Sequence, residues 1–413
     1  MNTQDLLPTL PAGYSWRMRL MLVGFGLLIA LVIGFGLLIL FPDLLPAEVT
    51  ASRYERFYSG TSYEVEYRIS DGDMFMFYSG SIRPPEDNAL LQHFMLTWDA
   101  DGFRVPAVPA ESYPIAAFGD SFTEGYTVPL PWPDLLAENL GVAVRNYGYR
   151  GYSPIETARA VEEFAGVEAR TWIIYMFFSG NDLNEITRAT RDPINARDPR
   201  YLIGFLAESA GDNIQGAVEY ETRDHYDYPT PVIIGGNYYE MVLLDLYLWS
   251  QIAPLEGFAA SRNAEILNAS LDQMEAAAPP RSCLAFVFAP NSAQLYFPYV
   301  YPTEKQWLLG QWRDQIIDED GLIQQGKAAP PPDADMIIET RLYDQYRFIR
   351  GVLADRSRWH FIDLLPAFEA AVGRGELLYY SYDTHWNSDG HALATQIIAE
   401  ALRDVSDCPL EFE

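Results

Sequence analysis

Hydrophobic and polar positions divide the chain into stretches with different periods. Residues 20–41 are an apolar run of 22 residues without a charge. Residues 43–110 alternate polar and apolar side chains, most clearly at 63–69, which predicts a β-rich lead segment of short antiparallel strands. From 111 to 404, short apolar runs alternate with amphipathic patterns, and residues 405–413 form a tail. This alternation predicts an α/β fold with a mostly parallel sheet flanked by helices.

The elements of the α/β part are marked by their flanking residues. Ser153, Pro154 and Glu156 combine an N-cap serine, a proline at the first helical position and a capping-box glutamate, so a helix is expected to start there. Residues from about 183 to 280 interrupt the pattern and are expected to be an insertion. The expected buried strands are 115–118, 142–146, 172–178, 284–288 and 361–362, and the other expected helices are 134–140, 238–252 and 389–403.

The apolar run is long enough to cross a bilayer. As a helix rising about 1.5 Å per residue, it spans the roughly 30 Å hydrocarbon core. Arg17 and Arg19 precede the run and acidic residues follow it. The positive-inside rule therefore predicts a cytoplasmic segment at 1–19, a single transmembrane anchor at 20–41 and an extracytoplasmic remainder. The alternatives are a cleaved signal peptide, whose apolar core is usually shorter, and a buried core helix.

Charge narrows the partners. The chain has 57 acidic and 28 basic residues, a formal net charge of −29. A basic footprint is absent, so nucleic acid is not an expected partner. Arg17, Arg19 and Asp5 give residues 1–41 a net charge of +1, which leaves −30 on the exported part. Such a domain repels polyanions at long range, which predicts a neutral or weakly charged substrate.

The two cysteines, Cys283 and Cys408, exclude a cysteine-dense scaffold and a four-cysteine zinc site. In an oxidising compartment they could form a disulfide that ties the C-terminal tail to a strand. Two unpaired structural thiols are equally compatible with the sequence, because spacing carries no geometry.

Four short polar motifs carry the candidate chemistry. The first three each follow a predicted strand, and the fourth lies near the C-terminus. Ligands of open α/β sheets collect at the carboxyl ends of the strands, so these motifs are expected to converge on one site. They are GDSFTEG at 119–125, NYGYRG at 146–151, SGND at 179–182 and DTHW at 383–386.

The residue types in these motifs suit acyl transfer. A serine hydroxyl needs a base to become a nucleophile, and a histidine base needs a carboxylate to fix its tautomer. Ser121, His385 and Asp383 supply these three groups. The backbone amides of Ser121 and Gly151 and the side-chain amide of Asn181 could donate hydrogen bonds to the oxyanion. The motifs therefore predict a serine esterase site.

This combination resembles the SGNH/GDSL hydrolase superfamily, named for its serine, glycine, asparagine and histidine. The resemblance implies a three-layer, flavodoxin-like α/β fold and ester hydrolysis. It maps the oxyanion glycine onto Gly151, at the end of the Asn-x-x-x-x-Gly run, rather than onto Gly148. The third block has Ser179 where the family pattern has glycine.

The last block departs from the family pattern, because Asp383 and His385 are two residues apart instead of three. This Asp-x-His-Trp variant is similar to the SGNH-like domains of alginate-type O-acetylation proteins. The resemblance implies an extracytoplasmic carbohydrate esterase that removes O-acyl, most directly O-acetyl, groups. An O-acetyltransferase with a membrane partner that supplies the acyl donor, or an inert carbohydrate-binding or assembly protein, are the alternatives.

Three further residues are candidates for substrate contacts. Arg150 lies beside the oxyanion glycine, and Tyr382 and Trp386 flank the catalytic histidine and could stack on a sugar ring. An exposed arginine and aromatic core packing are the alternatives.

A metal site is the remaining alternative for the last motif. Asp383, His385 and His391 could be drawn as ligands, but histidines six residues apart lack the spacing of a helical metal site. Neither a metal nor another cofactor is expected, and His391 is expected in the first turn of the last helix.

Overall fold

The fold is described from a computed structural model of the full chain. The described residues are 16–40, 58–68, 90–191, 229–243, 253–302, 305, 313–317, 323–327, 340–381 and 383–409.

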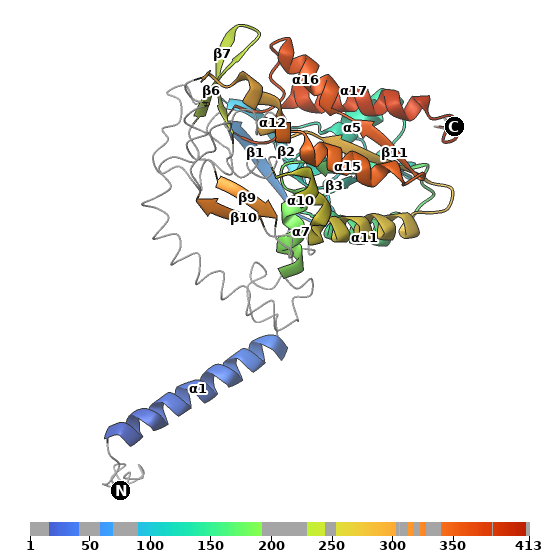
Figure 1. The fold of residues 1–413 in the computed structure, drawn as a ribbon. Helices are drawn as coiled ribbons and strands as arrows, with labels where there is room; N and C mark the ends of the chain where they lie inside the picture. The colour runs from blue at the N-terminus through green and yellow to red at the C-terminus, as the bar shows by residue number, and fades with distance from the viewer. Residues whose placement is uncertain are drawn as a thin grey trace.

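A five-stranded parallel sheet forms the centre of the protein (Figure 1). Numbered along the chain, its strands lie side by side in the order 2-1-3-4-5, the flavodoxin-like order. The predicted α/β fold with a parallel sheet is therefore confirmed. From one edge to the other the strands are β11 (Trp359–Asp363), β8 (Cys283–Ala289), β5 (Trp172–Phe178), β3 (Ile115–Gly119) and β4 (Val144–Gly148).

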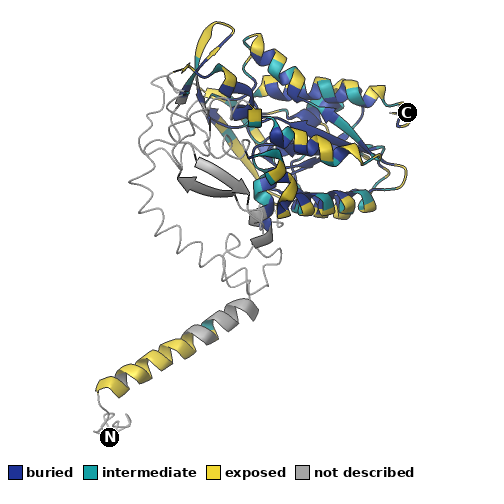
Figure 2. Cartoon of the chain, viewed as in Figure 1, coloured by how far each residue is buried: buried dark blue, intermediate teal, exposed yellow. Residues whose placement is uncertain are grey.

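The sheet is buried on both faces, and the sequence of its strands reflects this. Every residue of β3, β4 and β5 is buried, and β5 reads WIIYMFF without a charged side chain. A strand covered by helices on both faces needs apolar residues at successive positions rather than at alternate ones. Figure 2 shows the result, with buried residues through the centre and exposed ones on the outer faces of the helices.

Helices cover the sheet in two layers. Helices α5 and α17 pack against each other, as do α6, α7 and α11. Figure 1 shows α17 and α11 on opposite sides of the strands. The described helices of the α/β unit, residues 111–404, are α4 (Ser121–Glu124), α5 (Trp132–Leu140), α6 (Pro154–Phe164), α7 (Asp182–Arg191), α10 (Leu255–Ala260), α11 (Arg262–Ala277), α12 (Ser292–Tyr296), α15 (Asp344–Ala354), α16 (Leu365–Gly373) and α17 (Ser388–Asp404), with a 3-10 turn η2 (Phe297–Tyr299).

The N-terminus of α6 follows its local sequence. The Ser153 side chain accepts a hydrogen bond from the backbone N–H of Ile155 at 3.1 Å, and Glu156 Oε2 accepts one from the backbone N–H of Ser153 at 3.0 Å. These bonds satisfy amide groups that the first turn of a helix leaves without a partner.

The lead segment contains an antiparallel hairpin that packs against the α/β unit, for example through Tyr67 and Tyr380. Strand β1 (Ser62–Arg68) pairs with β2 (Leu90–Thr97). The next residues, Trp98 and Phe103, are fully buried, and Phe103 joins the main core. Residues 69–89 of the predicted lead segment lie outside the described part of the chain.

The predicted insertion contains a hairpin where a helix was expected. Strands β6 (Pro229–Ile234) and β7 (Asn237–Val242) are joined by Gly235 and Gly236, both with positive φ. The helix predicted from residue 238 is therefore wrong over 238–242, because a Gly-Gly pair between two β-prone runs closes a two-residue hairpin. Residues 244–252 lie outside the described part.

Helix α11 belongs to the core of the α/β unit, although it lies in the predicted insertion. Leu267, Leu271 and Met274 recur at helical spacing and are fully buried. The helix connects β5 to β8 on the face that it shares with α6. A second small hairpin, β9 (Arg313–Ile317) and β10 (Ile323–Lys327), lies between β8 and β11 in the sequence.

Most of the predicted membrane segment lies in helix α1 (Trp16–Leu40), whose described apolar side chains are largely exposed. A search of the described residues finds no helix with the length and apolar character that crossing a membrane requires. The membrane anchor stays a prediction.

A disulfide links the start of β8 to the segment after α17. Cys283 and Cys408 are bonded, with Cα atoms 6.3 Å apart and 125 residues between them in sequence. Of the two readings that the sequence left open, the disulfide is the one in the structure, and it ties the C-terminal tail to the central sheet.

Replacing both cysteines by alanine should lower the free energy of unfolding by about 2–4 kcal/mol, because the bond restricts the unfolded chain. Urea unfolding with and without reductant measures this. Reductant should destabilise the wild type by a similar amount and leave the double variant unchanged. Equal free energies of unfolding for the wild type and the double variant without reductant would contradict the prediction.

Candidate active site

The candidate nucleophile sits at a tight turn between β3 and α4. A Cβ on Gly119 would lie 2.4 Å from Thr123 Oγ1 and 2.9 Å from the backbone oxygen of Met176, so only glycine fits before the turn. Asp120 caps α4, and its Oδ1 accepts a hydrogen bond from the backbone N–H of Phe122 at 3.0 Å. This turn holds Ser121 at the carboxyl end of β3.

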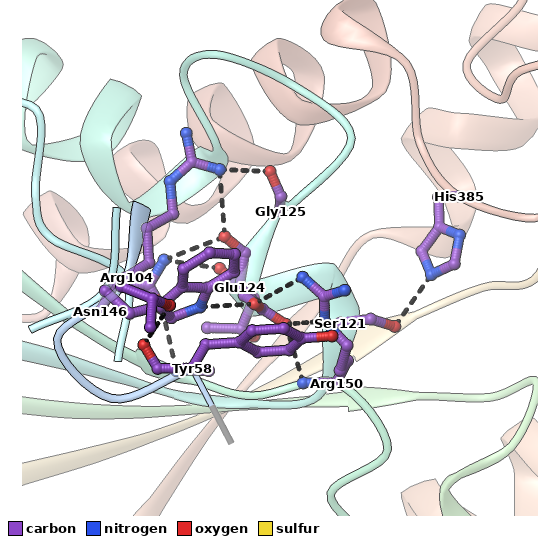
Figure 3. A network of polar contacts seen from close by, with 12 residues as sticks. Tyr58, Arg104, Ser121, Glu124, Gly125, Asn146, Arg150 and His385 are labelled. Atoms are coloured by element: carbon purple, nitrogen blue, oxygen red, sulfur yellow. Dashed lines mark hydrogen bonds and ion pairs between the residues drawn. The ribbon is translucent and has the colours of Figure 1, made fainter. Parts of the chain in front are cut away.

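Ser121, His385 and Asp383 form a hydrogen-bonded chain across 264 residues of sequence. Ser121 Oγ lies 2.9 Å from His385 Nε2, the contact drawn at the right of Figure 3. His385 Nδ1 lies 2.8 Å from Asp383 Oδ1. The Asp383 side chain is 2% exposed and that of His385 is 14% exposed. The carboxylate is therefore shielded from water while the imidazole stays accessible.

The two-residue spacing of Asp383 and His385 is accommodated by a local turn. Asp383 Oδ1 also accepts hydrogen bonds from the backbone N–H groups of Thr384 and His385, the second at 3.2 Å. One carboxylate oxygen therefore fixes both the backbone of this segment and the ring of His385. The departure from the family spacing leaves the histidine–carboxylate contact intact.

Two aromatic rings fix the orientation of the histidine. Phe122 stacks on the His385 ring with centroids 5.0 Å apart and planes at 28°. Tyr126 meets the ring edge-on at 5.0 Å and 71°. Phe122 itself stacks on Phe178, the last residue of β5, at 3.7 Å. These rings leave the imidazole little freedom to rotate away from Ser121.

The two other oxyanion candidates follow the neighbouring strands. Gly151 comes after β4 with φ +75°, and a Cβ there would meet no atom within 4 Å. Gly148, by contrast, packs against α4, where a Cβ would lie 2.3 Å from the backbone nitrogen of Glu124. Asn181 comes after β5, and its buried Oδ1 has no hydrogen-bond partner among the described residues. Donation to an oxyanion stays a prediction for Ser121, Gly151 and Asn181.

Two buried carboxyl groups, those of Asp120 and Asp182, lie beside the candidate site. Burial raises the pKa of Asp120 to about 7, against the opposing effect of the hydrogen bond from Phe122. Burial and the nearby Asp120 raise the pKa of Asp182 as well. Asp182 Oδ2 accepts hydrogen bonds from the backbone N–H of Phe178 at 3.1 Å and from Tyr175 Oη at 3.2 Å. Both acids therefore accept hydrogen bonds from backbone N–H groups beside the candidate site, Asp120 from α4 and Asp182 from the end of β5.

The structure contradicts the predicted substrate contact of Trp386, and it shows which side chain binds Arg150. The guanidinium of Arg150 is bound by Glu124, with Nε 3.0 Å from Oε2 and Nη2 2.9 Å from Oε1. Trp386 is fully buried and packs edge-on against Phe122 and near Phe368, so its ring is not available to a sugar. Tyr382 lies outside the described residues.

His391 has a structural position. It is buried in α17, and its Nδ1 accepts a hydrogen bond from the backbone N–H of Trp132 at 3.2 Å. Its ring also meets Trp386 edge-on at 5.5 Å. The ring therefore joins α17 to the start of α5.

Glu124, Phe122 and Tyr126 are the residues that the sequence reasoning missed. Phe122 and Glu124 lie inside the first motif, one on each side of Thr123, and Tyr126 directly follows the motif. Nothing in the motif indicates that the glutamate is buried or that both rings contact His385. Only the contacts identify them.

Residues 117–393 match the model of the GDSL-like lipase/acylhydrolase family, a span of more than half the chain. The chain belongs to this family. The match includes all four motifs and agrees with the resemblance to the SGNH/GDSL superfamily. The features particular to alginate-type proteins are not addressed by it.

Solved structures similar to this family member include several esterases and lipolytic proteins. A G-D-S-L lipolytic protein from Veillonella parvula is 14% identical, with 71% of this chain and 100% of that chain covered and a TM-score of 0.33. A catalytic mutant of an acetylxylan esterase from Geobacillus stearothermophilus is 10% identical, with 71% and 95% covered and a TM-score of 0.32. A phospholipase A1 from Streptomyces albidoflavus is 12% identical, with 70% and 98% covered and a TM-score of 0.34.

At these identities and TM-scores the similar structures carry no argument about the substrate. No curated protein matches the chain.

Burial lowers the pKa of His391 to about 3, whereas the unfolded chain protonates this residue near about pH 6.5. The unfolded state therefore binds the extra proton between these values. As pH falls below about 6.5, His391 should cost the folded state about 1.4 kcal/mol per pH unit. His391→Asn removes this dependence.

The advantage of the wild type over His391→Asn in free energy of unfolding should therefore shrink by about 2 kcal/mol between about pH 8 and about pH 5. Urea unfolding at the two pH values measures the difference. A constant advantage would mean that His391 is protonated in the folded protein.

Proposed function

We propose that this protein is a serine ester hydrolase that removes O-acyl groups, with an O-acetyl group on a carbohydrate as its substrate. The observation that carries the proposal is the chain of hydrogen bonds from Ser121 through His385 to Asp383. Membership of an acylhydrolase family supports ester hydrolysis. The carbohydrate rests on the resemblance of the Asp-x-His-Trp block to polysaccharide O-acetylation proteins.

The geometry suits a two-step reaction. Ser121 Oγ attacks the carbonyl carbon of the ester while His385 Nε2 takes the hydroxyl proton. The tetrahedral intermediate collapses when the imidazolium returns that proton to the leaving alcohol, and the acyl group stays on Ser121. Water, activated by the same nitrogen, then releases the acid and restores the serine.

Asp383 contributes through its charge as well as its position. When His385 is protonated, its Nδ1–H faces a carboxylate that is nearly shielded from water. An ion pair is stronger in such surroundings than in bulk water, so the imidazolium is stabilised when it forms. The stacked ring of Phe122 adds a favourable cation–π contact to the same charge.

Charge and placement favour a substrate without a negative charge. Arg150, which lies beside Gly151, has its guanidinium neutralised by Glu124. The segment after residue 41 carries a net charge of −30. With the proposed anchor at 20–41, the reaction would take place outside the cytoplasmic membrane, where neutral acylated glycans are accessible.

Hydrolysis of p-nitrophenyl acetate tests the assignment of the nucleophile. Ser121→Ala should reduce the rate to the background, because it removes the hydroxyl that lies 2.9 Å from His385 Nε2. Asp383→Asn should lower kcat by about two to four orders of magnitude with little change in KM, because the tautomer and the imidazolium lose their support.

The buried Ser153→Ala variant is the matched control, because this serine caps α6 and does not contact His385. It should keep its activity after a modest loss of stability of about 1 kcal/mol. Equal rates for Ser121→Ala and the wild type would sink the proposal.

The acceptor is tested with an acetylated neutral oligosaccharide. We expect free acetate and a mass loss on the sugar, because the acyl-enzyme is resolved by water. A mass gain on a second, unacetylated oligosaccharide would indicate an acetyltransferase instead. Faster turnover of a highly anionic glycan at low salt would contradict the argument from charge.

A further inference from the structure

Glu124 is a fully buried carboxylate that accepts four hydrogen bonds. Its Oε2 accepts from the backbone N–H of Arg150 at 2.9 Å and from Arg150 Nε at 3.0 Å. Its Oε1 accepts from Arg150 Nη2 at 2.9 Å and from Trp98 Nε1 at 3.0 Å. Burial of a charge is costly unless it is paired and fully hydrogen-bonded, as this one is.

These bonds join two parts of the candidate oxyanion site. Glu124 is the last residue of α4, the short helix that begins with Ser121. Arg150 directly precedes Gly151. The bond to the backbone N–H of Arg150 therefore sets the distance between the turn that carries one predicted oxyanion donor and the loop that carries another. Figure 3 shows the Glu124–Arg150 pair together with the Ser121–His385 contact.

The lead segment holds the other side of this network. Trp98 donates to the Glu124 carboxylate, and Arg104 donates to the backbone oxygens of Gly125, of Val128 at 3.0 Å and of Pro129 at 2.6 Å. Burial lowers the pKa of Arg104 to about 10, so it stays charged at neutral pH. The segment that follows the nucleophile is therefore fixed by two side chains from outside the α/β unit.

The same network reaches His385 through an aromatic ring. The guanidinium of Arg150 lies 4.1 Å from the ring centroid of Tyr126, and Tyr126 meets His385 edge-on. Tyr58, from the start of the described lead segment, lies 5.1 Å from the same guanidinium and stacks on Trp98. Arg150 is thus held by Glu124 and by aromatic rings from both parts of the chain.

We propose that Glu124 is a positioning residue for the oxyanion site: through Arg150 and Trp98 it locks the loop of Gly151 and the lead segment to the turn of Ser121. This inference rests on the proposed function. Through Trp98, the lead segment then contributes to the positioning of the oxyanion site, and it is more than a spacer between the proposed anchor and the α/β unit.

Glu124→Gln is the informative substitution because it keeps the size of the side chain. A glutamine offers one oxygen and presents an NH₂ group to the other donors, so at least one of the two pairs of bonds is lost. A small shift of the Gly151 loop misaligns an oxyanion donor but not the ground-state ester. We expect kcat for p-nitrophenyl acetate to fall about 10- to 100-fold with KM within about threefold.

Inhibition by phenylboronic acid supplies a readout that a purely structural role would not move. The boronate forms a tetrahedral adduct with a serine and places an oxygen in the oxyanion site. Its inhibition constant should rise for Glu124→Gln by about the same factor as kcat falls. Trp98→Phe, which removes the Nε1 donor and part of the ring but leaves the bonds from Arg150, should change both quantities in the same direction by a smaller factor.

Asp134→Asn is the matched control. Asp134 is also a buried carboxylate bound to the lead segment, since its Oδ1 accepts from the backbone N–H of Ala107 at 3.1 Å, but within the described residues none of its hydrogen bonds reaches the loop of Gly151. This variant should lose thermal stability and keep kcat and the boronate inhibition constant. Combining Glu124→Gln with Arg150→Gln should be no slower than Glu124→Gln alone, because both remove one link.

A folded Glu124→Gln protein with unchanged kcat and boronate inhibition overturns the inference, as does an equal loss of kcat in Asp134→Asn. The proposed function fails separately, when wild type and Ser121→Ala hydrolyse the ester equally. In that case the inference fails with it.

Discussion

Parallel pairing of β3 with a strand on each side is the constraint on which the site depends. Because β4 and β5 run in the same direction as β3, all three strands end at one edge of the sheet. The loops that follow them carry the candidate nucleophile Ser121, Gly151 and Asn181. The strand order reverses between β3 and β5, and such reversals leave a crevice in which ligands of open α/β sheets bind. His385 reaches this edge from the segment before α17.

Buried acidic groups are the second theme of the molecule. Asp120, Glu124 and Asp182 lie around the candidate nucleophile, and all three are buried and hydrogen-bonded. Asp120 and Asp182 accept from the backbone of Phe122 and Phe178, and Glu124 accepts from the backbone and side chain of Arg150. Apolar residues would cost less to bury but could not fix the direction of a loop. Burying these acidic groups costs folding free energy. They fix the positions of the groups that they bind, because each oxygen accepts hydrogen bonds only along defined directions. This explains why a domain of high negative charge keeps several acids out of water beside its reaction centre.

Much of the fold could be predicted from the sequence because its signals are local. The strand at 172–178 and the capping box at Ser153 matched the structure, since a continuous apolar run and a capping pattern act within a few residues. The Gly235–Gly236 pair is an equally local signal, and it outweighs the helical pattern that was expected from residue 238. Helix α11 lies inside the predicted insertion, but the stripe of Leu267, Leu271 and Met274 is buried in the core.

The sequence by itself determined the family resemblance, the positions of the motifs after the strands and the candidate triad. Four motifs in a fixed order at the ends of strands are compatible with few kinds of site. Only the tertiary structure decided that Arg150 is bound by Glu124 and that Trp386 is buried in the core. It also decided that the two cysteines pair and that Glu124 joins the lead segment to the oxyanion loop. Some of these contacts join segments more than a hundred residues apart in the sequence. No local pattern encodes which side chain fills the space beside another.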